Sequence, residues 1–223
     1  LVNSRDSEDE KDRTRMSLAY NFNGVLPFSD EIQVLAYTQD SETVQLTLEN
    51  RLPPGPTSVA QNRSRNSIFE QQIDGMLVSA RKDIEFGSVV HRLVYGSEYY
   101  STENKTLRDG GTTEALTGVT VREFFPLPTR DFPATEVDQL AFFVQDEIEL
   151  MNGRLILSPG IRYDDFEAKA TADAIYLAGN PGISAPEDFS DSEVTAKLGV
   201  VYEFTSDLSI YGNVSEGFRA PPY

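Results

Sequence analysis

Residues 140–164 of the chain read LAFFVQDEIELMNGRLILSPGIRYD. Apolar residues recur at alternate positions on both sides of Asn152-Gly153, which is the pattern of a β-strand with one apolar face. Asn-Gly between two such runs is typical of a type I′ turn, because both central residues need positive φ. The stretch therefore predicts an antiparallel hairpin. Since Pro159 cannot donate a ladder hydrogen bond, we expect a β-bulge in the return strand.

The same alternation recurs along most of the chain. It predicts strands at residues 16–22, 31–49, 64–80, 89–101, 140–150, 154–164, 193–204 and 208–215. This makes about eight strands with hardly any helix, so the predicted fold class is all-β. The first 13 residues are polar and charged, and we expect a loop or a disordered end at residues 1–13.

The connections between these strands alternate in length. Residues 24–30, 81–88, 152–153 and 206–207 form short connections, whereas residues 50–63, 103–136 and 167–191 form long ones. Outer-membrane barrels place tight turns on the periplasmic side and long loops outside. Several strands also exceed the roughly 9–11 residues that cross a bilayer at a tilt. The sequence therefore predicts an antiparallel transmembrane β-barrel, with a soluble β domain as the alternative.

The composition limits the chemistry that the chain can carry. It has a net charge of −17, no Cys and one His. Nucleic-acid binding is not expected, because phosphate contacts need clustered Lys and Arg. Disulfides, zinc sites and Cys-based catalysis are excluded, and no catalytic or metal-binding set is predicted. No apolar run approaches the roughly 18 residues of a membrane helix. The N-terminal residues lack the pattern of a signal peptide.

Two features admit both a functional and a structural interpretation. His91 is either a haem ligand or catalytic base, or an interfacial side chain; it shares its parity with Leu93 and Tyr95, which predicts the outward face beside a short turn. The expected long loop contains FFPLP at residues 124–128. This apolar segment either packs on the rim or contacts a flat ligand or a protein partner.

Four segments resemble strands of a known family. They are VHRLVYGSEY at residues 90–99, LAFFVQDEI at 140–148, LSPGIRYD at 157–164 and LSIYGNVSEGFRAP at 208–221. In this order they resemble the barrel of TonB-dependent outer-membrane receptors. The resemblance covers residues 14–223 and implies that residues 1–223 are a partial barrel domain, from a wall of about 22 strands with a plug in its lumen. The plug domain and the TonB box are expected upstream of Leu1.

The resemblance also implies a function. Receptors of this family bind an iron carrier or haem outside the cell and import it across the outer membrane of a Gram-negative bacterium, with energy from TonB–ExbB–ExbD. The resemblance thus implies a transporter in contact with outer-membrane lipid rather than an enzyme, with no permanently bound cofactor.

The segment GFRAP resembles the FRAP box of the haem/haemoglobin receptor branch. This implies a ligand-binding role for Phe218, Arg219, Ala220 and Pro221. Arg219 could pair with a haem propionate, or the box could shape the barrel rim. Haem, or iron derived from a haem protein, is then the expected transported ligand. A siderophore receptor of the same class is one alternative, and a soluble or surface β-rich binding module is another.

Overall fold

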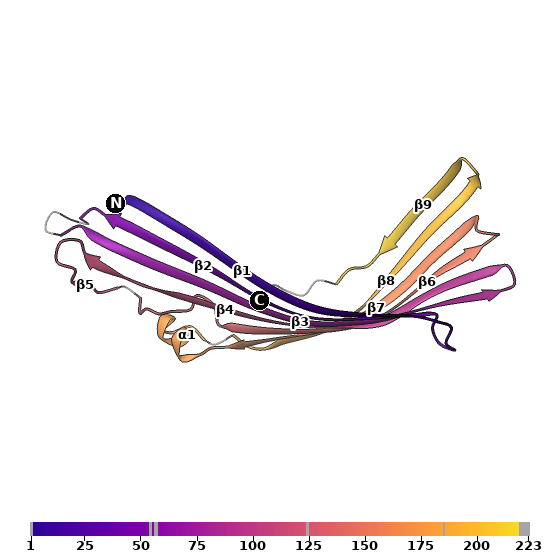
Figure 1. The fold of residues 1–223 in the computed structure, drawn as a ribbon, viewed down its shortest axis with the longest axis horizontal. Coiled ribbons are helices and arrows are strands. Elements are labelled where there is room, and N and C mark those ends of the chain that lie inside the picture. Colours follow the sequence, from indigo (N-terminus) through magenta and orange to yellow (C-terminus); the bar gives the residue numbers. More distant parts are fainter. Residues whose placement is uncertain (1, 54, 56–57, 124, 185, 219–223) are drawn as a thin grey trace.

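The computed structural model describes residues 2–53, 55, 58–123, 125–184 and 186–218. They form one antiparallel sheet, in which every strand except β5 pairs with the next one along the path from β1 to β9 (Figure 1). The strands are β1 Val2–Asn23, β2 Glu31–Arg51, β3 Gln61–Phe86, β4 Val89–Glu114, β5 Thr120–Val121, β6 Ala134–Leu150, β7 Leu155–Thr171, β8 Phe189–Thr205 and β9 Leu208–Ser215. Strand β5 pairs with the end of β4, and helix α1, Ala174–Gly179, lies between β7 and β8. The all-β antiparallel prediction is confirmed.

The strand register lines up a row of mostly apolar residues on one face of the sheet, here called the outer face. Tyr20, Val34 and Val78 are direct cross-strand neighbours. The row continues through Ser97, Phe142, Tyr163 and Val194. These large side chains are exposed rather than covered: Phe142 is 51% exposed and Val194 is 50% exposed. An apolar face of this extent fits a wall that faces lipid.

The apolar band covers only part of the longer strands. On β1, the outer-face positions carry Met16, Leu18 and Tyr20 towards the turn and Glu8 and Asp12 towards the other end. Strands β1 to β4 have 21 to 26 residues, and only about 9–11 are needed to cross a bilayer. At roughly 3.3 Å per residue, ten further residues extend the sheet by about 33 Å beyond the band.

Residues 2–13 are part of a strand, which corrects the loop or disordered end expected at residues 1–13. β1 begins at Val2 and pairs with β2 residue by residue from Ser4 to Asn23. Both faces of this part of β1 are charged and exposed, so the sequence shows no alternation there. The backbone ladder holds it in place, together with cross-strand pairs such as Arg5 with Glu49.

The long connections are shorter than the sequence suggested, but the predicted alternation of short and long connections is confirmed. β4 continues to Glu114 and β7 to Thr171. The sequence did not predict these strand ends, because polar residues occupy both of their faces. Residues 24–30, 87–88, 151–154 and 206–207 connect strands at one end of the sheet, the short-turn end. Residues 52–60, 115–133 and 172–188 connect them at the opposite end, the long-loop end.

The predicted hairpin is present between β6 and β7, with its turn displaced by one residue. The Leu150 carbonyl accepts a hydrogen bond from the Gly153 N–H at 3.1 Å. Met151 and Asn152 are therefore the central residues, and both have positive φ, 56° and 58°. The expected bulge is wrong, since β7 keeps one register with both neighbours on either side of Pro159. The β6 pairing skips from Gly160 to Leu157 because proline lacks an N–H.

The sheet has almost no buried core. Among the described residues, the buried hydrophobic side chains are Ala141, Phe166, Ala168 and Tyr176. A soluble β-sandwich would instead pack two sheets face to face around a dry core. One sheet with an exposed apolar face fits a barrel wall. Within the described ranges, no helix has the length and apolarity required to cross a bilayer.

Candidate ligand-binding site

The face opposite the apolar band, here called the inner face, is polar and carries close packing over glycine. Tyr37 and Gly75 are direct neighbours on β2 and β3. The Tyr37 ring lies over Gly75, where a Cβ atom would come within 2.3 Å of it. The Arg15 guanidinium lies 4.4 Å from the centre of the same ring, which is a cation–π distance. A polar inner face is what a wet or plugged lumen requires.

A polar network joins β4, β6 and β7 in the middle of the inner face. Asp164 is 4% exposed and accepts hydrogen bonds from Gln139 Nε2 at 3.0 Å and from Arg162 Nε at 2.9 Å. Arg162 also reaches Glu98 at 3.1 Å, and the Tyr100 hydroxyl donates to Gln139. Arg162 and Asp164 share a face because they are two residues apart on a strand. Arg162 and Asp164, which belong to the RYD segment at residues 162–164, therefore link β7 to β4 and β6.

His91 lies on the outer face, as its parity predicted. Its cross-strand neighbours are Ile84 and Ile148, and its Nδ1 lies 2.7 Å from Oδ2 of Asp146. This is the short-turn end of the sheet, where Lys82 also pairs with Asp30 at 2.8 Å. The position supports an interfacial side chain, because the ring is on the face away from the lumen.

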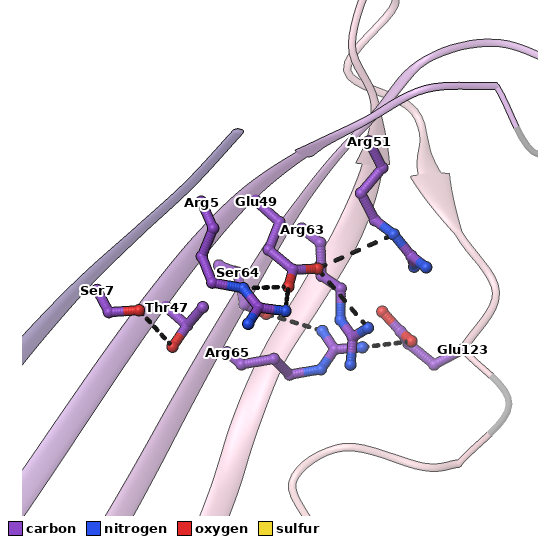
Figure 2. A network of polar contacts seen from close by, with 9 residues as sticks. All are labelled: Arg5, Ser7, Thr47, Glu49, Arg51, Arg63, Ser64, Arg65 and Glu123. Atoms are coloured by element: carbon purple, nitrogen blue, oxygen red, sulfur yellow. Dashed lines mark hydrogen bonds and ion pairs between the residues drawn. The ribbon is translucent and has the colours of Figure 1, made fainter. Parts of the chain in front are cut away.

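An arginine cluster surrounds one carboxylate at the long-loop end of the inner face (Figure 2). Glu49 is 8% exposed, and its Oε1 accepts from Arg5 Nη2 at 2.6 Å and from Arg5 Nε at 2.9 Å. Its Oε2 lies 3.9 Å from both Arg51 Nε and Arg63 Nη1. The register brings these residues together, since Arg5, Glu49 and Arg63 are neighbours on three consecutive strands. Three guanidinium groups thus share one carboxylate.

A cavity of about 500 Å³ opens beside this cluster. Its lining combines the ends of β2 to β4 with the loops around β5 and α1: Arg51, Arg63, Arg65, Arg108, Glu123, Phe125, Leu127, Thr129, Arg130, Asp131, Gly179 and Asn180. Five arginines face two carboxylates, so the lining is basic although the chain as a whole is acidic. Such a lining suits an anionic ligand.

Hydrogen bonds join two loops over this cavity. They hold α1 beside the loop that follows β5 (Figure 1). Arg130 Nε donates to Asp173 Oδ2 at 2.8 Å and Arg130 Nη1 to the Thr106 carbonyl at 2.5 Å. The Asn180 side chain donates to the Arg130 carbonyl at 3.0 Å. Asp173 also caps α1, since it accepts from the Tyr176 N–H at 2.8 Å. Residues far apart in sequence therefore form one fixed rim.

Two of the rim carboxylates outside the strands, Asp173 and Glu123, are held in their charged form. The Tyr176 N–H lowers the pKa of Asp173 below its ordinary value of 3.8, and Arg130 adds to this against the opposing effect of burial. Burial raises the pKa of Glu123, but hydrogen bonds from Thr112 and Arg65 outweigh it, so this pKa also lies below its ordinary value. Both residues therefore remain negative at neutral pH and keep their arginines in place.

Replacement of Asp173 by Ala is expected to loosen the rim, at a cost of about 1 kcal/mol from the lost cap. Because the folded pKa is lowered, the contribution of Asp173 is present above pH 3.8 and is lost as the pH falls through the folded pKa. Hydrogen exchange of residues 172–188 in the full-length receptor, corrected for intrinsic rates, should rise in the variant at neutral pH. An equal rise in Asp191→Ala, whose side chain accepts a hydrogen bond from the N–H of its neighbour Ser192, would contradict this.

The structure places the sequence-predicted site only in part. Phe218 follows β9 and is partly exposed. Arg219, Ala220 and Pro221 lie outside the described residues, so a ligand role for this box stays a prediction. Of the apolar segment at residues 124–128, Phe125 and Leu127 line the cavity. The arginine cluster was missed; its one sequence signal is that Arg51 and the pair Arg63 and Arg65 flank a proline-rich loop.

Comparison with known proteins gives the same architecture. The family model described as TonB dependent receptor-like, beta-barrel, matches residues 2–223. No curated protein sequence matches significantly. The ferric citrate transporter FecA in its unliganded form has a TM-score of 0.62 at 17% identity, over 93% of this chain and 27% of that one. The siderophore receptor PiuA from Acinetobacter baumannii gives 0.59 at 15%, over 92% and 32%. The ferric preacinetobactin receptor BauA from the same organism gives 0.56 at 16%, over 93% and 30%.

These structural likenesses, at low identity, establish the fold, and the chain spans about a third or less of each of those proteins. The family match covers nearly the whole chain. It agrees with the single antiparallel sheet, its exposed apolar face and its alternation of short turns and long loops. The chain belongs to the TonB-dependent receptor β-barrel family, whose members reside in the outer membrane of Gram-negative bacteria.

Proposed function

We propose that the protein to which this chain belongs imports a ferric chelate of the siderophore type across the outer membrane, with energy supplied through TonB. The observation that carries the proposal is the arginine-lined cavity on the inner face, at the end of the wall with the long loops. Barrels of this kind present their long loops to the outside. A ligand arriving from the medium would therefore meet the cavity first.

The structural neighbours support an iron chelate as the cargo. FecA is a ferric citrate transporter, PiuA is a siderophore receptor and BauA is a ferric preacinetobactin receptor. Receptors of this family are transporters, so the proposed function includes no catalysed reaction. The expected partners are TonB–ExbB–ExbD, reached through a plug, and the lipid that covers the outer face.

Haem is the second candidate, favoured by the sequence GFRAP at residues 217–221. An arginine-lined cavity also suits haem, because its propionates are carboxylates that pair with guanidinium groups. Haem is then transported cargo rather than a resident cofactor. The siderophore-type proposal comes first because the structural neighbours support it in addition to the cavity, which suits both ligands.

Growth on single iron sources tests the proposal. The full-length receptor would be expressed in a Gram-negative host that lacks its own iron receptors. Under iron limitation it would be offered ferric citrate, a catecholate, a hydroxamate or haem. We expect growth on at least one ferric chelate, and loss of that growth when TonB is deleted. Growth on haem alone would favour the second candidate, whereas TonB-independent growth would contradict both.

A further inference from the structure

The cavity at the long-loop end is basic in a chain of net charge −17, since five arginines face Glu123 and Asp131. We infer that it recognises an anionic ferric chelate that presents free carboxylates, with Arg51 and Arg63 as the residues that bind them. The inference rests on the proposed function and narrows it to one chemical class of ligand. Neutral hydroxamate chelates are excluded as preferred ligands.

Three of the lining arginines already have carboxylate partners. Arg65 pairs with Glu123 at 2.7 Å, Arg108 with Asp131 at 2.5 Å and Arg130 with Asp173 at 2.8 Å. Each pair fixes one guanidinium group on the wall of the cavity. Their charges are balanced within the protein, so they shape the site more than they attract a ligand.

Arg51 and Arg63 make no side-chain hydrogen bond with any residue that the structure describes. Both lie 3.9 Å from Glu49 Oε2, which is beyond hydrogen-bond distance, and Oε1 of the same carboxylate is held by Arg5. Among the described residues, the buried Nε of Arg63 has no hydrogen-bond partner. That nitrogen is closed to the cavity, but the Arg63 side chain as a whole is 33% exposed, so its guanidinium group can meet a ligand. A carboxylate fits, because it accepts two parallel hydrogen bonds from one guanidinium group.

The position and size of the cavity restrict which kind of molecule can bring the ligand carboxylate. The arginines lie on the inner face and the apolar band lies on the outer face, so lipid headgroups have no access to them. A volume of about 500 Å³ falls within the range of small-molecule sites, which is about 300–1,000 Å³. The ligand is therefore a compact soluble chelate.

Calorimetric titration of the full-length receptor in detergent micelles tests the inference. The probes are ferric citrate, which is a polycarboxylate chelate, and a neutral ferric trihydroxamate. Arg63→Gln is expected to weaken ferric citrate binding about tenfold or more, because it removes a charged donor. Glu49→Gln is expected to tighten it, because Arg51 and Arg63 lose their competing carboxylate. Effects of opposite sign cannot arise from general damage to the fold.

Arg81→Gln is the matched control, because Arg81 lies on the same strand and face at the short-turn end. Its affinity for ferric citrate should equal that of the natural receptor. Unchanged affinity in Arg63→Gln would overturn the inference. So would weaker binding in both Arg63→Gln and Glu49→Gln, which would assign the cluster to contacts within the receptor. TonB-dependent growth on a neutral chelate, without binding of ferric citrate, would overturn the inference but not the proposed function. Absence of growth on every iron source would overturn the proposed function.

Discussion

Gly96→Ala is expected to destabilise the full-length receptor by about 3 kcal/mol, at the upper end of the usual cost of overpacking. A Cβ atom at Gly96 would lie 2.2 Å from the Val78 carbonyl oxygen and 2.9 Å from the Phe143 ring. The ring could turn aside, but the carbonyl belongs to the backbone of β3. Since β4 pairs with β3 on one side and β6 on the other, it cannot move away from β3 without straining its second ladder.

Gly111→Ala is the matched control for this prediction. It lies on the same strand, and a Cβ atom there would meet nothing within 4 Å. The urea concentration at half-unfolding, followed by circular dichroism of refolded receptor, should fall for Gly96→Ala and stay nearly constant for Gly111→Ala. The amount of folded receptor in the outer membrane should fall in parallel. Equal midpoints for the two variants would show that the strands absorb the added methyl group.

Asp164→Ala is expected to cost about 2 kcal/mol, because it removes one member of a buried ion pair. Asp164 is 4% exposed and accepts from both Arg162 and Gln139. Among the carboxylates that the structure describes, its loss leaves Arg162 paired with Glu98, at 3.1 Å. The expected cost is below that of a fully buried pair, because the Arg162 side chain remains 34% exposed.

The next residue supplies the comparison for Asp164. Asp165 is exposed on the outer side of the same strand, and Asp165→Ala should shift the urea midpoint little. Replacing Arg162 by Gln as well as Asp164 by Ala should recover part of the lost stability, because no unpaired charge then remains. A double variant less stable than Asp164→Ala would mean that Arg162 contributes chiefly through Glu98.

The strands that touch lipid could be predicted from the sequence. From Met16 to Phe22, and again on both sides of Asn152-Gly153, a bilayer on one face and a polar lumen on the other impose strict alternation. That alternation also placed His91 on the outer face. The turn itself was displaced by one residue: the Gly153 N–H closes it onto the Leu150 carbonyl, and Met151 adopts positive φ as well as Asn152 and Gly153.

The first half of β1 and the ends of β4 and β7 could not be predicted in this way. Beyond the bilayer both faces of the sheet meet water, so residues such as Glu8 and Asp12 carry no periodic signal. Their strand structure comes from pairing with β2, which provides the hydrogen bonds that local sequence does not specify. Helix α1 is six residues long and depends on its Asp173 cap and on Arg130 from another loop.

The sequence alone determined the fold class, the alternation of short and long connections, and the apolar face of the membrane-spanning strands other than β3. On β3 the predicted apolar residues Phe69, Ile73 and Leu77 lie on the inner face. These properties are local, since each follows from neighbouring residues and their contact with lipid or water. Only the tertiary structure decided where the arginine-lined cavity lies. Arg5, Glu49 and Arg63 are separated by 44 and 14 positions in the chain, and the loop held by Arg130 and Asp173 joins residues 43 apart. Strand register brings such residues together, and register is a property of the assembled sheet.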